Sequence, residues 1–215
     1  MRCIVAALLP SGNHAMAEWG TMRRFCGLGG ASLPYNRSNE EGPARRGGHH
    51  GREQNRQRTA SKNPLVKAIR ELLEHRALWL YLLTDEAAKA GADPAAFAPA
   101  AVKRCGLFQG AELVAKGGGT NSLKSLKKGL FGKPAQMVFE MDVKDVQDDR
   151  FELEFHYCPL VKAWQKQGCT DEEISNLCDW AMCGDRGIGE AYGCDLDLPK
   201  TIARGDDVCH LIYHR

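Results

Sequence analysis

The spacing of apolar residues changes along the chain, and this change limits the folds that the chain can adopt. From Pro64 onward, apolar residues recur at the helical spacing of about 3.6 residues. From about Gln136 they approach the alternation of about 2 residues that is typical of strands. The order predicts an α+β fold, with N-terminal helices followed by an antiparallel sheet of about four strands with intervening helices.

Residues 1–63 differ from the rest in composition. Much of this segment is rich in Gly, Arg, Asn and Ser and offers almost nothing apolar to bury. We interpret residues 1–63 as a disordered extension, or as a non-native extension that begins at a start site upstream of the true one. Residues 64–215 are long enough to form one well-buried α+β domain.

Charge and cysteine content exclude several classes of protein. The net charge of the whole chain is +2, but residues 64–215 hold 19 basic and 23 acidic residues and show no basic face, so we expect no nucleic-acid partner. No apolar run reaches the roughly 18–20 residues that span a bilayer, so we expect no membrane contact. The nine cysteines, an odd number without the spacing of a small disulfide scaffold, predict free thiols and a cytoplasmic location. A small-molecule substrate is the expected partner, and a homo-oligomer is left open.

Local signals place the individual elements. Pro64 and Pro94 suit first helical positions, with Asp93 as the cap of the second helix. Thr170 and Glu173 form the sequence pattern of a capping box. The expected helices cover about residues 64–90, 94–116, 122–130 and 159–167, and one more begins at Thr170; the expected strands cover 136–143, 151–157, 195–202 and 207–213.

Six of the nine cysteines lie in the last sixty residues, which makes this stretch the candidate site. They are Cys158, Cys169, Cys178, Cys183, Cys194 and Cys209. Cys158 follows a strand and precedes Pro159, so it stands at the N-cap of a helix. Unpaired amides and the helix dipole at that position predict a pKa for the Cys158 thiol below the ordinary value of about 8.5. The thiol is a candidate nucleophile or metal ligand; alternatively, it replaces serine as a weak cap.

Two more thiols and two carboxylates lie near Cys158 in the expected fold. Cys178 and Asp185 are seven residues apart and share one face of a helix if that helix continues through Gly184. Cys209 belongs to the last strand, close to Asp206. Asp206 either caps backbone amides in its turn or serves as a general base. No Cys-x-x-Cys motif occurs, so we expect no cofactor; the alternative is zinc or iron bound by Cys158, Cys178 and Cys209.

Several short motifs together resemble a known family. They are Cys158-Pro159-Leu160, Leu177-Cys178, Gly184-Asp185, the segment from Lys200 to Asp206 with Cys209, and the helical segment 76–87. Over about residues 64–215 the chain resembles the L-2-amino-thiazoline-4-carboxylic acid hydrolase family. Its closing strand is also similar to that of small-molecule-binding domains of the 4-vinyl-reductase type.

The first resemblance implies a reaction and roles for individual residues. Water adds at C2 of a cyclic thiazoline, and the ring opens towards N-carbamoyl-cysteine. The implied catalytic residues are Cys158, Cys178, Asp185, Asp206 and Cys209, and the implied substrate-binding residues are Arg186, Arg204 and His156. The second resemblance implies instead a non-catalytic domain that senses a small molecule or a metal.

Overall fold

The computed structural model describes residues 62–215. The extension predicted for residues 1–63 therefore lies outside the described residues, except for its last two. In chain order the elements are α1 (Pro64–Lys89), the 3₁₀ helix η3 (Pro94–Ala96), α2 (Ala98–Lys116), α3 (Leu123–Leu130), α4 (Lys133–Phe139), β1 (Met141–Val146), β2 (Arg150–Phe155), α5 (Pro159–Gln167), α6 (Asp171–Tyr192), β3 (Asp195–Lys200), the 3₁₀ helix η4 (Ile202–Arg204) and β4 (Cys209–His214). This order confirms the α+β fold.

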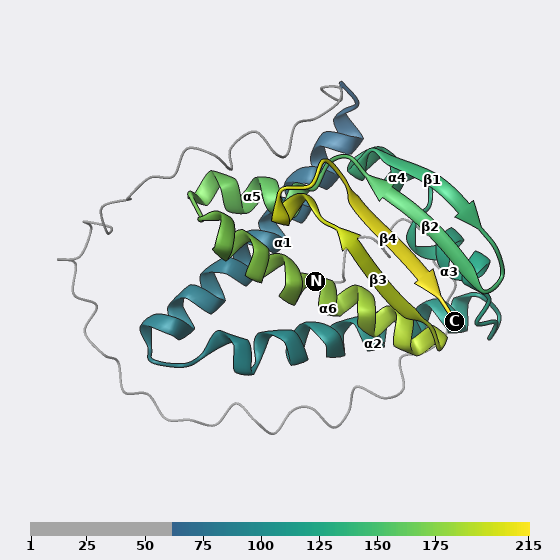
Figure 1. Cartoon of the computed structure of the whole chain (residues 1–215), viewed down its shortest axis with the longest axis horizontal. Coiled ribbons are helices and arrows are strands. Elements are labelled where there is room, and N and C mark those ends of the chain that lie inside the picture. Colours follow the sequence, from purple (N-terminus) through teal and green to yellow (C-terminus); the bar gives the residue numbers. More distant parts are fainter. Residues whose placement is uncertain (1–61) are drawn as a thin grey trace. The chain divides into compact units, whose positions relative to one another are not determined.

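The four strands form one antiparallel sheet in the order β1-β2-β4-β3 (Figure 1). The four predicted strands therefore share one sheet, with β2 and β4 at its centre. One face of these central strands is buried and carries Phe151, Leu153, Phe155, Cys209, Leu211 and Tyr213. The intervening residues are half-buried, so the second face of the sheet, which we call the outer face, meets solvent. It includes Glu152, Glu154 and His210.

The helices are joined to one another by close contacts. α2 runs beside α6 (Figure 1), and a Cβ added to Gly106 would lie 1.9 Å from the carbonyl oxygen of Gly184, so the two backbones touch. α1 packs beside α5, and the buried Trp164 of α5 donates a hydrogen bond from Nε1 to the Ala77 carbonyl at 3.0 Å. None of the helices within residues 62–215 has an apolar stretch long enough to cross a membrane.

The local signals at the helix starts are confirmed. Asn63 accepts a hydrogen bond from the Leu65 amide at 3.0 Å and caps α1. Thr170 and Glu173 form the predicted capping box at the start of α6. This helix then continues without interruption through Gly184 to Tyr192, which keeps Cys178 and Asp185 on one helix.

Two predicted elements are different in the structure. The second helix is interrupted at Phe97, because Asp93 caps only the short η3 and α2 begins at Ala98. Residues 136–139, predicted as part of a strand, belong to α4, which begins at Lys133 with Pro134 in its first turn and ends before Glu140, whose backbone is left-handed with φ 52°. The strand β1 therefore begins only at Met141.

Candidate functional site

Cys158 occupies the predicted position at the N-cap of α5. Its backbone is extended, and Pro159 is the first residue of the helix. Burial raises the pKa of the Cys158 thiol, although the amides of Val161 and Leu160 and the charge of Arg76 act in the opposite direction. The predicted lowering of this pKa is therefore wrong, because loss of hydration outweighs the amides at the helix start.

Cys178 of α6 and Cys209 of β4 are both buried and lie within electrostatic reach of Cys158. Burial raises the pKa of Cys209 to about 12, and a charge on Cys158 would raise it further. Burial also raises the pKa of Cys178, to which both other thiols contribute. The Cys209 sulfur accepts a hydrogen bond from the Ile202 amide at 3.3 Å. The three thiols thus belong to three parts of the chain that lie within electrostatic reach of one another, and burial favours the protonated form of each.

Asp185 lies two helical turns beyond Cys178 on α6 and is half-buried. Burial raises the pKa of its carboxyl group, while the charges of Arg76 and Arg186 lower it. Tyr213 of β4 has a fully buried hydroxyl group that finds no hydrogen-bond partner of good geometry among the described residues. Burial and the neighbouring Asp185 carboxylate raise the pKa of this hydroxyl well above its ordinary value.

Cys158 is electrostatically linked both to the other two thiols and to Asp185. The charges of both Arg76 and Asp185 act on its thiol, although the three residues come from α1, α6 and the start of α5. The result is a site with one thiol, one half-buried carboxyl group and one exposed guanidinium group. This combination can hold an anionic ligand and move a proton between sulfur and oxygen.

Arg76 and Tyr213 were not identified as functional residues from the sequence. In the sequence, the segment 76–87 is notable only for its resemblance to the family. An arginine on an amphipathic helix is ordinarily a solvated charge. Arg76 is separated from Asp185 by more than a hundred residues, and no local pattern links them. Tyr213 belongs to the buried face of a strand, where an aromatic residue is expected for packing alone.

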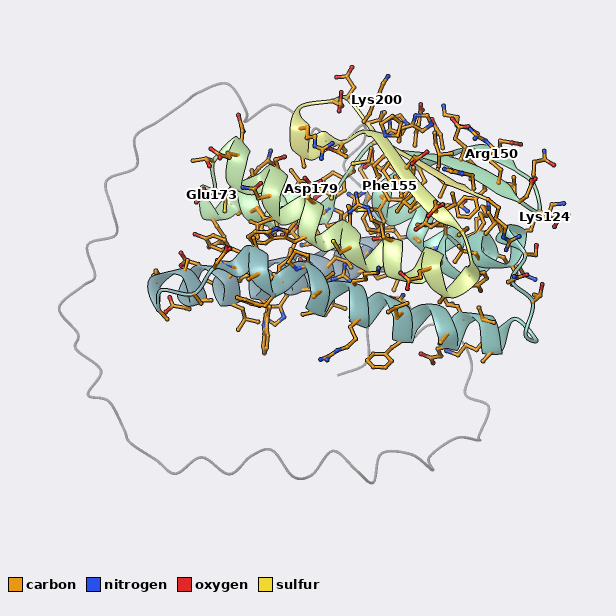
Figure 2. All side chains as sticks on the ribbon, turned by 60° about the horizontal axis from the view of Figure 1, so that its bottom comes forward. Lys124, Arg150, Phe155, Glu173, Asp179 and Lys200 are labelled. Atoms are coloured by element: carbon orange, nitrogen blue, oxygen red, sulfur yellow. The ribbon has the colours of Figure 1, made fainter. Side chains whose placement is uncertain are left out.

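Other predicted site residues have structural partners elsewhere. Asp206 accepts a hydrogen bond from the Thr201 amide at 2.8 Å. Of the two roles considered for Asp206, this contact matches the capping of a backbone amide in its turn. Arg204 donates to both carboxylate oxygens of Asp179, at 2.8 and 3.0 Å. Asp179 follows Cys178 on α6 (Figure 2), so this ion pair lies beside the group of thiols. His156 pairs with Asp142 at 3.0 Å on the outer face of the sheet.

Arg186, the second predicted anchor for a substrate carboxylate, lines a cavity of about 570 Å³. The Arg186 Nη1 atom lies 3.5 Å from the Asp179 carbonyl oxygen, a weak contact that leaves most of its donors to other partners. Lys103 and Arg215 also line this cavity, together with three carboxylates. The cavity is therefore of mixed charge and borders the helix that carries Asp185.

The outer face of the sheet holds a separate group of ligating side chains. Asp142, Glu154 and His156 place one ligand atom each within 4.8 Å of one another. Within residues 62–215, no other set of three His, Cys, Asp or Glu side chains meets this limit of 4.8 Å. The thiols of Cys158, Cys178 and Cys209 do not meet it. The alternative of zinc or iron bound by Cys158, Cys178 and Cys209 thus has no preformed ligand set.

The structure is an α+β domain, and its candidate thiol-carboxylate centre consists of Cys158, Asp185 and the neighbouring Arg76. The model of the L-2-amino-thiazoline-4-carboxylic acid hydrolase family matches residues 70–213. This range covers most of the chain, and the chain belongs to that family. The resemblance inferred from the short motifs is therefore confirmed.

Two further comparisons add little to the family match. No curated protein matches the chain. Among solved structures, the chain is similar to a trafficking protein particle complex subunit 3 from Naegleria fowleri covalently bound to palmitic acid, with 17% sequence identity and a TM-score of 0.43. That match covers 66% of this chain and 93% of the other.

Proposed function

We propose that the chain hydrolyses a small cyclic amidine that bears a carboxylate, of the 2-amino-thiazoline-4-carboxylate type. Membership of the family supports the reaction class. The observation that supports the proposal is that the charges of Arg76 of α1 and Asp185 of α6 both act on the Cys158 thiol at the start of α5, and that Arg76 also acts on Asp185. These residues supply a nucleophile, a base and a cation for the substrate carboxylate.

The buried thiol of Cys158 needs a base, because its raised pKa keeps it protonated near neutral pH. Asp185 is suited to this role, since burial moves the pKa of its carboxyl group upward, towards the range in which general bases work. In the first step a bond forms between the Cys158 sulfur and C2 of the ring, and the bond from C2 to the ring sulfur breaks. The thiol proton passes through Asp185 to the departing ring sulfur.

Water completes the reaction at the same carbon. It adds to C2 while Asp185 accepts one of its protons and delivers it to the former ring nitrogen. The bond from C2 to the Cys158 sulfur then breaks, and the second proton of the water returns to that sulfur. The product is N-carbamoyl-cysteine, and the enzyme regains its starting state.

Arg76 is the proposed anchor for the substrate carboxylate. Its guanidinium group is exposed and makes no ion pair within 4 Å among the described residues, whereas Arg204 is engaged by Asp179. Arg186 adds a second positive charge that acts on Asp185. The buried hydroxyl of Tyr213, which neighbours Asp185, can donate a hydrogen bond to the tetrahedral adduct, where charge develops during the reaction.

Turnover of 2-amino-thiazoline-4-carboxylate by the purified full chain tests the proposal, with N-carbamoyl-cysteine measured by mass spectrometry. We expect Cys158→Ala to abolish the reaction and Asp185→Asn to slow it about 100-fold or more, the contribution of a positioned base. Arg76→Gln should raise KM more than it lowers kcat. The matched controls are Cys183→Ala, at a cysteine of α6 that is half-buried like Cys158, and Asp195→Asn. Full activity of Cys158→Ala would sink the proposal.

A second candidate function is non-catalytic binding of a small molecule, as in domains of the 4-vinyl-reductase type. The raised pKa values of Cys158, Cys178 and Cys209 favour it, because protonated buried thiols pack as small apolar groups. This function predicts no turnover and a tightly held small molecule in native mass spectrometry. Replacement of the three cysteines by serine would then change the affinity for the ligand, and there would be no reaction rate for it to change.

A further inference from the structure

We propose that Asp142, Glu154 and His156 bind a divalent metal ion on the outer face of the sheet. The site shares no residue with the thiol-carboxylate centre and does not depend on the hydrolase activity. It lies on the face that the helices leave open, on strands β1 and β2.

The strand register brings the three side chains together. Asp142 of β1 pairs directly with Glu154 of β2, so both side chains leave the same face of the sheet. His156 follows Glu154 by two residues and returns to that face. It also donates a backbone hydrogen bond to the Phe139 carbonyl at 3.2 Å, which fixes its position beyond the end of β2. Figure 2 labels Phe155, which separates these two residues in the sequence, and Arg150, the first residue of β2.

The distances suit a first-row metal ion. The three ligand atoms lie within 4.8 Å of one another, and the His156 Nε2 and Asp142 Oδ2 atoms are 3.0 Å apart. Two ligands at about 2.1 Å from a tetrahedral ion are about 3.4 Å apart. Small side-chain movements therefore bring all three atoms to bonding distance. The His156 side chain is only 8% exposed and held by its surroundings, so it provides a fixed ligand.

A cation already occupies this position in the structure. The Lys144 ammonium lies 2.7 Å from Glu154 Oε2 and 3.8 Å from Asp142 Oδ2. Lys144 is half exposed and has a flexible side chain. A divalent ion can displace it and neutralise both carboxylates at once.

Manganese is the appropriate probe. Carboxylate ligands, of which the site has two, suit Mn²⁺, whereas thiolates prefer softer ions such as zinc and Cu(I). The thiols of Cys158, Cys178 and Cys209 therefore compete poorly for Mn²⁺. Loss of the electron paramagnetic resonance signal of free Mn²⁺ measures binding directly.

We expect the full chain, freed of metal with a chelator, to bind one Mn²⁺ ion at this site. Removal of an outer-shell partner alone costs about 10–100-fold in metal affinity, so His156→Ala and Glu154→Gln should each weaken binding at least tenfold. Lys144→Met should tighten binding because it removes the competing cation. Cys158→Ala should leave it unchanged.

Asp197→Asn is the matched control. Asp197 pairs with His214 at 2.9 Å, another pair of a carboxylate and a histidine on a strand of the same sheet, but not part of a set of three ligand atoms within 4.8 Å. Its replacement should not affect Mn²⁺ binding. If His156→Ala fails to fold by circular dichroism, the half-exposed Glu154→Gln decides alone. No binding at millimolar Mn²⁺, unchanged binding in Glu154→Gln, or an equal loss in Asp197→Asn would each overturn the proposal.

Discussion

The carboxyl group of Asp185 is held in a half-buried position that raises its pKa, which means that folding disfavours its ionised form. A group whose pKa is higher in the folded than in the unfolded protein lowers stability as pH rises through the interval between the two values. Asparagine does not titrate. Asp185→Asn should therefore increase the free energy of unfolding near neutral pH, on the order of 1 kcal/mol, while it removes the proposed base.

Urea denaturation of both proteins checks this expectation. The gain should be present near neutral pH and should disappear below the pKa of a free aspartate, about 3.9, where both states carry the proton. Asp195→Asn, at an exposed position, serves as the control and should show no such gain. Equal stability of Asp185→Asn and the unmodified chain at all pH values would contradict the buried-carboxylate interpretation.

The thiols differ in burial, and their reactivity should follow it. Cys105 is exposed, whereas Cys178 and Cys209 are buried with raised pKa values. Because the thiolate is the reactive form, iodoacetamide at mildly alkaline pH should label Cys105 first. Cys178 and Cys209 should react only after urea is added, as peptide mass spectrometry can measure. Rapid labelling of Cys209 in the folded chain would show that this thiol is not shielded.

Only those residues of the site that a local sequence pattern marks could be predicted from the sequence. Cys158 was identified because a strand, a cysteine and a proline in succession define a helix N-cap. The sign of its pKa shift was missed, since burial depends on α1 and α6 packing around it. Arg76 and the group of Asp142, Glu154 and His156 depend on tertiary contacts or strand register, and neither can be read from neighbours in the sequence.

At the scale of elements, the backbones of α2 and α6 approach each other closely, and glycine makes this approach possible. An added Cβ at Gly106 would lie 1.9 Å from the Gly184 carbonyl oxygen, and that obstacle is backbone rather than a flexible side chain. Gly106→Ala should therefore push the helices apart and lower the free energy of unfolding by about 1–3 kcal/mol or more. Chemical denaturation measures the loss.

Gly132→Ala provides the control for that substitution. A Cβ at Gly132 would lie 3.6 Å from the nearest atom, the Lys128 carbonyl oxygen, which is ordinary contact. Its backbone φ of −68° is accessible to alanine. If Gly106→Ala were no more destabilising than Gly132→Ala, the two helices would have to be less tightly packed than the structure indicates.

The elements that matched the prediction share strong local signals. Alternation in residues 151–155 and a capping box at Thr170 each indicate one structure without help from the rest of the fold. Residues 136–139 carry a weaker signal, because a short apolar run fits a strand and a helix equally. Pro134 is compatible with a helix start, and the left-handed Glu140 then separates α4 from β1.

At the scale of the whole described domain, one buried arginine joins the first helix to the start of the sheet. Arg70 of α1 donates to the Val138 carbonyl at 2.8 Å and to Glu140 at 3.0 Å. Its guanidinium group also lies 4.0 Å from the centre of the Tyr157 ring. These contacts link α1 with the end of α4, the residue before β1 and the loop between β2 and α5.

Loss of this arginine should weaken the domain more than loss of a surface cation. Arg70→Met removes the guanidinium group and leaves Glu140 with little solvent, so we expect a loss of about 3 kcal/mol in the free energy of unfolding. Glu140→Gln in the Arg70→Met background should cost less than in the unmodified chain, because the charge that needed a partner is removed. Lys67→Met, which breaks an exposed pair with Glu71 on the same helix, should have little effect. Urea denaturation of the four variants measures these differences. Additive costs for Arg70 and Glu140, or a cost for Arg70→Met no larger than for Lys67→Met, would show that the arginine does not join helix and sheet.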